Sequence, residues 1–133
     1  MEYFRLVYTS VVRGAPPSYN ELAELLRVSR DNNAKLGVTG VLCYADGVFL
    51  QALEGDRDVV NRLYGKIERD RRHADCQILV CMPSDHRRFP DWSMKLVAVD
   101  SALLEGVTLT AMNGPQAEAF LGLRADEERR RAA

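Results

Sequence analysis

The chain has 133 residues, of which 47% are hydrophobic and 28% charged, a composition typical of a folded domain rather than a disordered chain. Its 18 Lys and Arg against 19 Asp and Glu leave a formal net charge of −1. This balance argues against direct nucleic-acid binding, which requires an excess of cationic residues on one face. The longest apolar runs, such as 78–82, fall far short of the roughly 18 to 20 residues that span a bilayer, and the N-terminus lacks a secretion signal. We therefore expect one cytoplasmic domain with no membrane association.

The first elements of the chain are a strand and a helix. Residues 2–9 alternate between two faces, which predicts a strand. The segment Ser18-Tyr-Asn-Glu21 is a capping box, in which a hydroxyl and a carboxylate satisfy free amides at a helix start. The helix is predicted to continue to about Leu36, with Gly37 as its C-terminal cap.

A β-hairpin and a second helix are predicted next. The apolar segments 38–44 and 48–53 flank Ala45-Asp46-Gly47, a turn in which Gly tolerates a positive φ. The second helix is predicted over about Asp56 to Arg71, with Asp56 as its N-cap. Its inward face consists of Val59, Val60, Leu63, Tyr64 and Ile67.

Two further strands and short helices complete the pattern. Strands are predicted at 76–82 and 92–99, separated by a polar stretch with prolines that cannot join a central strand. Short helical pieces are predicted at 101–106 and 115–123. The polar end 126–131 has acids and bases three and four apart, which is typical of a solvated, self-paired helix.

The order strand, helix, strand, strand, helix, strand, strand predicts the α+β class. It is the split βαβ pattern of a ferredoxin-like sandwich, with two helices on one face of a five-stranded sheet. The opposite face carries apolar residues such as Val7, Val41 and Ala52. We expect this outer face to support a homo-oligomer.

Cysteine, metal and nucleotide motifs exclude several functions. Cys43, Cys76 and Cys81 form no C-x-x-C motif and lie in apolar segments, so we expect buried free thiols. No cluster of His, Cys or carboxylate residues has metal-ligand spacing, and we predict no metal site. The sequence also lacks the G-x-S-x-G, P-loop and G-x-G-x-x-G motifs, which removes the main support for a hydrolase or a nucleotide triphosphatase.

Three polar features fall where the pattern predicts a core. Asn32 and Asn33 continue the apolar stripe of the first helix, while Gln51 and Tyr8 each share a strand face with large apolar side chains. An unpaired buried amide costs about 1 to 3 kcal/mol, so each group needs a partner. Singly, each could bond within the core; together they are typical of a pocket for a flat, hydrogen-bonding ligand.

The end of the second helix has two interpretations, which the sequence leaves open. Its charged residues are Lys66, Asp70, Arg71, Arg72 and His73. They could complement the helix dipole. Alternatively, the cations could hold the anionic tail of a dinucleotide at the mouth of the pocket.

These features lie within five segments that closely resemble BLUF domains, the blue-light sensors that use flavin adenine dinucleotide (FAD). In chain order the segments are Leu-Val-Tyr8-Thr-Ser, Asn32-Asn33-Ala-Lys-Leu-Gly-Val-Thr-Gly40, Gly47-Val-Phe-Leu-Gln51-Ala-Leu-Glu-Gly55, Asp70-Arg-Arg-His73 and Arg87-Arg-Phe-Pro-Asp-Trp92-Ser-Met94. The resemblance implies a photosensor domain over 2–98 and a C-terminal helical extension over 99–133.

The resemblance also implies which residues bind the cofactor. It implies that FAD lies between the two helices and is bound non-covalently, with FMN or riboflavin as possible substitutes. Asn33 and Asn32 are expected to bond the polar edge of the flavin ring, and Asp70 to contact its lower edge. Lys66 and Arg72 are expected near the ribityl or phosphate groups.

A light-driven mechanism follows from the same resemblance. Light is expected to draw an electron and a proton from Tyr8 through Gln51, which is left rotated or tautomerised with a stronger bond to the flavin. Trp92 and Met94, two apart and so on one predicted strand face, are expected to relay the change. Because no matching segment or second domain follows Val99, we expect a short stand-alone sensor without enzymatic activity that signals to a separate protein.

The sequence leaves two other functions open. One is a ferredoxin-like flavin enzyme or small-molecule-binding module that acts in the dark. The other is a structural interaction domain with an empty core. A photosensor that forms a cysteine adduct is disfavoured, because no cysteine stands in an Asn-Cys-Arg context.

Overall fold

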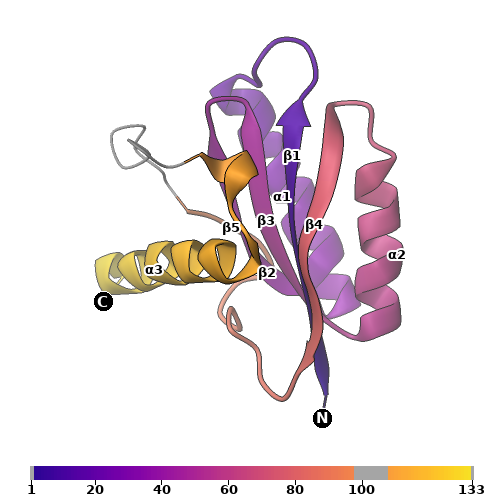
Figure 1. Cartoon of the computed structure of the whole chain (residues 1–133), viewed down its shortest axis with the longest axis vertical. Coiled ribbons are helices and arrows are strands. Elements are labelled where there is room, and N and C mark those ends of the chain that lie inside the picture. The colour runs from indigo at the N-terminus through magenta and orange to yellow at the C-terminus, as the bar shows by residue number, and fades with distance from the viewer. Residues whose placement is uncertain (1, 98–107, 133) are drawn as a thin grey trace.

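A five-stranded sheet with strand order β4-β1-β3-β2-β5 forms the centre of the computed structural model, which describes residues 2–97 and 108–132 (Figure 1). Neighbouring strands pair antiparallel, except β2 and β5, which are parallel. The predicted α+β, ferredoxin-like sandwich is confirmed. The elements are β1 (Tyr3–Val12), α1 (Tyr19–Leu36), β2 (Thr39–Ala45), β3 (Val48–Gly55), α2 (Arg57–Glu68), β4 (His73–Ser84), β5 (Lys95–Leu96), the 3-10 turn η2 (Leu109–Ala111) and α3 (Gly114–Ala132).

Local signals account for the start and end of α1 and for the hairpin. The Ser18 hydroxyl accepts from Glu21 N, and the Glu21 carboxylate accepts from Ser18 N, as the capping box requires. Gly37 ends the helix in the left-handed region, with φ at 70°. Asp46 and Gly47 both have positive φ in the turn between β2 and β3, the backbone that favours a two-residue hairpin loop.

The second helix is shorter than the sequence predicts. Asp56 caps α2 by accepting from the amides of the first turn, but the helix ends at Glu68 rather than Arg71. His73, predicted in its cationic end, is instead buried at the start of β4. Its Nε2 donates to the Ile67 carbonyl over 2.5 Å, and its Nδ1 lies 2.7 Å from Ser10 Oγ. The Ile67 carbonyl therefore accepts from the imidazole as well as from Asp70 N, which lies 3.1 Å away in the turn that ends the helix.

The last predicted strand and the C-terminal helices also differ. β5 spans only Lys95–Leu96. Its pairing with β2 is flanked by two backbone hydrogen bonds, from Gly40 N to Trp92 O and from Val97 N to Leu42 O. The predicted pieces 115–123 and 126–131 are parts of one helix, α3. The piece 101–106 lies outside the described residues.

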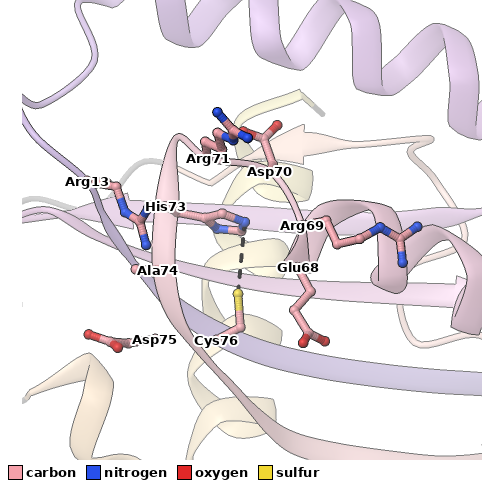
Figure 2. A pocket seen from close by; sticks show the side chains of 9 residues that line it. All are labelled: Arg13, Glu68, Arg69, Asp70, Arg71, His73, Ala74, Asp75 and Cys76. Atoms are coloured by element: carbon pink, nitrogen blue, oxygen red, sulfur yellow. Dashed lines mark hydrogen bonds between the residues drawn. The ribbon is translucent and has the colours of Figure 1, made fainter.

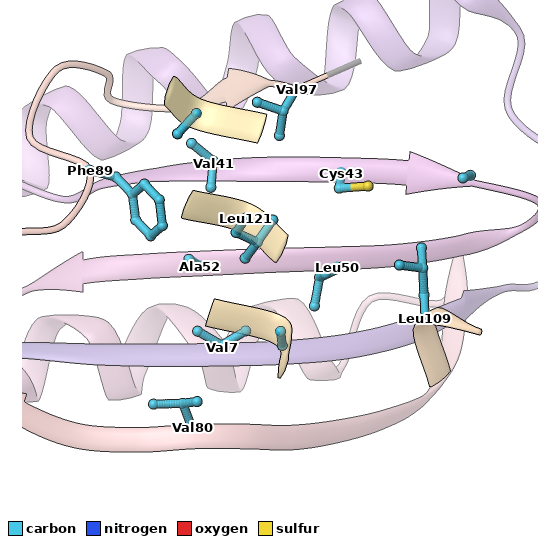
Figure 3. Packing of buried hydrophobic residues seen from close by; sticks show 13 residues of the cluster. Val7, Val41, Cys43, Leu50, Ala52, Val80, Phe89, Val97, Leu109 and Leu121 are labelled. Carbon is cyan, nitrogen blue, oxygen red and sulfur yellow. The ribbon is translucent and has the colours of Figure 1, made fainter. Parts of the chain in front are cut away.

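The outer face of the sheet is covered by α3, so the expected oligomer surface there is wrong. Val7, Val41 and Ala52 are fully buried. They form one core cluster with Ala117, Leu121 and Ala125 of α3 (Figure 3). The apolar residues of this face are satisfied within the chain and are not free to bind a second copy.

The other face of the sheet carries a second core cluster beneath α1 and α2. Leu26 of α1 and Val60 and Tyr64 of α2 pack there against β1, β2 and β3. The cluster includes Tyr8 and Met94, so the polar features noted in the sequence lie within it.

The cysteines are less uniformly buried than predicted. Cys43 is buried and Cys76 partly buried, but Cys81 is exposed. Cys76 and Cys81 lie on β4, an edge strand that the helices cover only in part. None of the helices in the described residues combines the length and apolar character that a bilayer crossing requires.

Gly40 is required where β2 passes β3, and we expect Gly40→Ala to lower the free energy of unfolding by about 1 to 3 kcal/mol. An added Cβ would lie 1.9 Å from the Ala52 carbonyl oxygen and 3.3 Å from Met94 Cε. The backbone oxygen cannot give way, so the strands must separate. Chemical denaturation of the two proteins measures the difference.

The matched control is Gly65→Ala in α2. Its added Cβ meets nothing nearer than Arg69 Nη1 at 3.6 Å. This variant should be up to about 1 kcal/mol more stable, because Ala is the better helix former. Equal stability of the two alanine variants would contradict the assignment of Gly40.

Candidate functional site

Three buried side chains form a hydrogen-bonded chain on the face that α1 and α2 cover. Tyr8 on β1 stands directly opposite Gln51 on β3 in the antiparallel register, so the two side chains share that face. The Tyr8 hydroxyl donates to Gln51 Oε1, and Gln51 Nε2 donates to Met94 Sδ over 3.3 Å. All three residues are at most 6% exposed. The Gln51 amide is therefore held at both ends, by a phenol and by a thioether, which is a weak acceptor.

The Tyr8 phenol is neutral and keeps its proton. Burial raises the pKa of Tyr8 far above its ordinary value, and the nearby Cys76 and Tyr64 raise it further. Tyr64 packs its ring against that of Tyr8 in an edge arrangement, with centroids 5.2 Å apart. Burial likewise raises the pKa of Tyr64 to about 12. Tyr8 is therefore a hydrogen-bond donor to Gln51 throughout the physiological pH range.

Only one of the two asparagines faces this core. Asn33 is 2% exposed, and its Nδ2 donates to the Ser93 carbonyl over 2.9 Å. Asn32 is exposed, so its placement on the inward stripe is wrong. Successive helical residues lie about 100° apart, and only Asn33 continues the line of Leu26.

Trp92 and Met94 lie on opposite sides of the sheet, which corrects the prediction that they share one strand face. Met94 packs into the cluster beneath α1 and α2, and Trp92 into the cluster beneath α3. The alternation of a strand does not apply, because β5 begins only at Lys95 and the preceding residues form a bend. Of the two, Met94 contacts Gln51.

α3 is tied to the segment that carries Trp92 and Met94. The Arg129 guanidinium lies 5.2 Å from the centre of the Trp92 ring. Its Nε donates to Asp91 over 2.6 Å, and its Nη2 donates to the Arg88 carbonyl over 3.2 Å. α3 therefore contacts the chain two residues before Met94.

The end of α2 forms a polar cavity of about 340 Å³ (Figure 2). Three arginines and three carboxylates line it, together with the His73 and Cys76 side chains, whose Nε2 and Sγ lie 3.9 Å apart. Asp70 is paired with Arg72 at 2.6 Å, and this bond holds the pKa of the Asp70 carboxyl down to about 2. Lys66 is exposed on α2. The charges at this end are balanced, in place of the cationic cluster that the sequence suggested.

A second concavity, of about 410 Å³, lies beside α1 and fits a flavin cofactor. It is lined by Asn20, Glu21, Glu24, Leu25, Val28 and Arg72. Val28 is 42% exposed, so apolar surface of α1 stands uncovered there. Its carboxylates are already engaged, Glu21 with Ser18 and Glu24 with Arg27. The apolar surface of α1, the Asn20 amide and the Arg72 guanidinium suit a flat ring with a polar edge and an anionic tail.

Sequence reasoning missed two residues of this region. Arg30 Nε donates to the Met94 carbonyl over 2.9 Å, and Ser93 supplies the carbonyl that Asn33 holds. Arg30 lies on the polar face of α1, and its partner is 64 positions away. No local pattern marks either residue, because their contact depends on where the segment before β5 crosses α1.

Curated relatives of this chain are light-activated enzymes. The photoactivated adenylate cyclase subunit beta of Euglena longa is 38% identical over 80 residues, which cover 59% of this chain and 9% of that protein. A photoactivated adenylate cyclase subunit alpha-like protein of Euglena gracilis is 33% identical over 98 residues, covering 73% of this chain and 10% of the relative. The chain thus spans about a tenth of the length of these relatives.

Solved structures with the same fold include two of similar length. BlsA in its photo-activated state superposes with a TM-score of 0.84 at 31% identity, covering 92% of this chain and 94% of that one. The dark state of BlrB, described as a BLUF protein, gives a TM-score of 0.79 at 34% identity, with 95% and 97% covered. A bacterial light-regulated adenylyl cyclase matches at 35% identity and a TM-score of 0.70, over 81% of this chain and 33% of that one.

The sequence model of the BLUF family, described as "Sensors of blue-light using FAD", matches residues 3–95. This range contains the complete Tyr8, Gln51 and Met94 chain and all four of the paired sheet strands that precede β5. BLUF domains are sensors rather than catalysts, which excludes a dark enzyme as the function of residues 3–95. Because they use FAD, an interaction domain with an empty core is excluded as well. The chain therefore belongs to the BLUF family and is a blue-light photoreceptor domain that uses FAD.

Proposed function

We propose that blue light reorganises the hydrogen bonds of Gln51 and that the change leaves the domain through the segment before β5 and α3. The observation that carries this proposal is the buried chain from Tyr8 through Gln51 to Met94. A primary amide can exchange its oxygen and nitrogen ends by turning, and each end of Gln51 has a different partner. One side chain can thus hold two distinct bonding patterns.

The chain's own residues prepare this change. When bound, the flavin supplies the absorption of blue light and an excited-state electron acceptor. Tyr8 holds an oxidisable ring and a proton that its hydroxyl directs at Gln51 Oε1. Turning the Gln51 amide breaks its bond to Met94 Sδ and places Nε2 toward the Tyr8 oxygen. Because the sulfur is a weak acceptor, this bond opposes the turn only modestly.

We assign the cofactor contacts as the sequence suggested, as part of this proposal. The Asn33 side chain makes one hydrogen bond among the described residues, to Ser93, so its amide has capacity left for the polar edge of the flavin ring. Arg72 lines the concavity beside α1, which supports a contact with ribityl or phosphate oxygens. Asn32 and Lys66 are exposed and can reach only a cofactor atom outside the core, while Asp70 would contact the ring while paired with Arg72.

The output is proposed to reach a separate protein effector. We place the photosensor unit at 2–98 and the output element at 99–133. The contacts of Arg129 with the segment before β5 support this division into a sensing unit and an output element. Similar domains occur within photoactivated adenylate cyclases, which supports a light-controlled effector as the recipient of the signal. The free thiols, Cys81 exposed among them, favour the cytoplasm as compartment, and a homo-oligomer would have to use a surface other than the one α3 covers.

The visible absorption spectrum before, during and after blue illumination tests the proposed function. We expect a yellow protein whose flavin bands move slightly to longer wavelength in the light and return in darkness. The shift reflects a changed hydrogen bond to an otherwise unaltered ring. A protein whose bands only bleach, or that takes up no flavin, would contradict the proposal.

A further inference from the structure

Two consecutive carbonyls before Met94 are held from different parts of the fold. The Trp92 carbonyl accepts from Gly40 N of β2 over 3.0 Å, as a continuation of the sheet. The Ser93 carbonyl accepts instead from Asn33 Nδ2 of α1 over 2.9 Å. The backbone of this segment therefore stops bonding to the sheet one residue before Met94 and bonds to α1 instead.

The Met94 carbonyl continues this arrangement with Arg30 as its donor. Arg30 Nε lies 2.9 Å from that oxygen in a partly buried bond, while β5 begins only at Lys95. The guanidinium is always charged, and a charged donor makes a stronger hydrogen bond than a neutral amide. Arg30 thus restrains the backbone of the residue whose sulfur accepts from Gln51.

We propose that Arg30 is a positioning residue, which holds the Met94 backbone so that Met94 Sδ accepts from Gln51 Nε2 and thereby prolongs the lit state. This inference rests on the proposed function. In this proposal, dark recovery restores the Gln51 bonds to Tyr8 and Met94, and the Met94 side chain must move away and return while the amide turns. A backbone pinned at Met94 makes that movement slower, and a free one makes it faster.

Arg30 differs from Asn33 because, in the part of the chain that the structure describes, its side chain makes a single hydrogen bond. The Asn33 amide is proposed to serve both the Ser93 carbonyl and the cofactor, so its loss would confuse flavin binding with the position of the segment. Arg30 Nε donates to the Met94 carbonyl. Its replacement therefore tests the position of Met94 with the flavin contacts left in place.

The test uses Arg30→Met in the flavin-loaded protein, which keeps an unbranched side chain as far as the position of Nε and removes the donor. We expect dark recovery after illumination to be at least about fivefold faster, because that is the rate effect of one lost hydrogen bond of ordinary strength and a charged donor bonds more strongly. The size of the spectral shift should be unchanged, because Tyr8 and Gln51 are intact. In darkness, the backbone amides of the peptide 91–97 should exchange hydrogen for deuterium faster than in the parent protein.

Two further variants make the result specific. Arg30→Lys restores a charged donor of similar reach and should return both recovery and exchange most of the way to the parent values. Arg27→Met removes an arginine one turn earlier on α1, whose partners within 2–97 and 108–132 are the exposed Glu24 and Asp31, and it should change neither. Unchanged or slower recovery in Arg30→Met, or the same change in Arg27→Met, would overturn the inference. If the parent protein shows no reversible shift at all, the proposed function itself has failed.

Discussion

Replacing Tyr8 by Phe is expected to abolish the reversible spectral shift while the domain still folds and binds flavin. The substitution removes one oxygen from a side chain that is 3% exposed, so the packing of its ring against Tyr64 persists. It also removes the donor to Gln51 Oε1 and the proton that the proposed photochemistry requires. The unpaired amide oxygen should lower the free energy of unfolding by about 1 to 3 kcal/mol. Absorption spectra in light and darkness, and denaturation in darkness, measure the two effects.

Tyr64→Phe provides the matched control for this result. Tyr64 is a second buried tyrosine of the same cluster and makes no hydrogen bond to Gln51 among the described residues. The variant should keep the reversible shift. A Tyr8→Phe protein that still shifts and recovers, or a Tyr64→Phe protein that has lost the shift, would contradict the assignment of Tyr8 as the proton source.

Replacing Glu54 by Ala is expected to lower the free energy of unfolding by about 3 to 5 kcal/mol, the largest stability effect we predict. Glu54 is fully buried and accepts from Arg5 Nε at 2.9 Å and from the amides of Arg88 and Phe89 at 2.8 and 2.6 Å. Its removal leaves three donors without their acceptor, one of them the charged Arg5. Denaturant unfolding in darkness gives the difference.

The same substitution should loosen α3, because Arg5 also bonds Glu118 of that helix over 2.8 Å. Faster hydrogen exchange in α3 would accompany the loss of stability. Glu24→Ala is the control, since its partner Arg27 is equally exposed and surface pairs contribute little. A Glu54→Ala protein no less stable than the Glu24→Ala protein would show that the buried carboxylate is not needed to join β1, β3 and α3.

Much of the fold could be predicted because its signals are local. The capping box at Ser18 and the turn at Asp46 and Gly47 act over three or four residues, and the structure has both where they were expected. The limits of α2 and β4 were wrong because a distant contact decided them. His73 pairs with Val12 and its buried ring bonds Ser10 of β1, so β4 begins three residues before the predicted strand.

The candidate site divides in the same way. Periodicity placed Tyr8, Gln51 and Asn33 on buried faces, and the register of β1 with β3 then set Tyr8 beside Gln51. Trp92 was misplaced because the alternation of a strand was applied to a bend. Arg30 carried no signal, since its one partner in this region is a backbone carbonyl far along the chain.

The sequence by itself determined the α+β class, the capped helices, the hairpin and the family to which the chain belongs, because each depends on neighbouring residues or on short segments in a set order. Tertiary structure alone decided that Met94 rather than Trp92 meets Gln51, that Arg30 holds the Met94 backbone and that α3 covers the outer face of the sheet. The first two of these contacts join residues that are 43 and 64 positions apart. Their formation depends on how β5 bends across the sheet edge and where α3 docks, which short-range patterns of hydrophobicity do not encode.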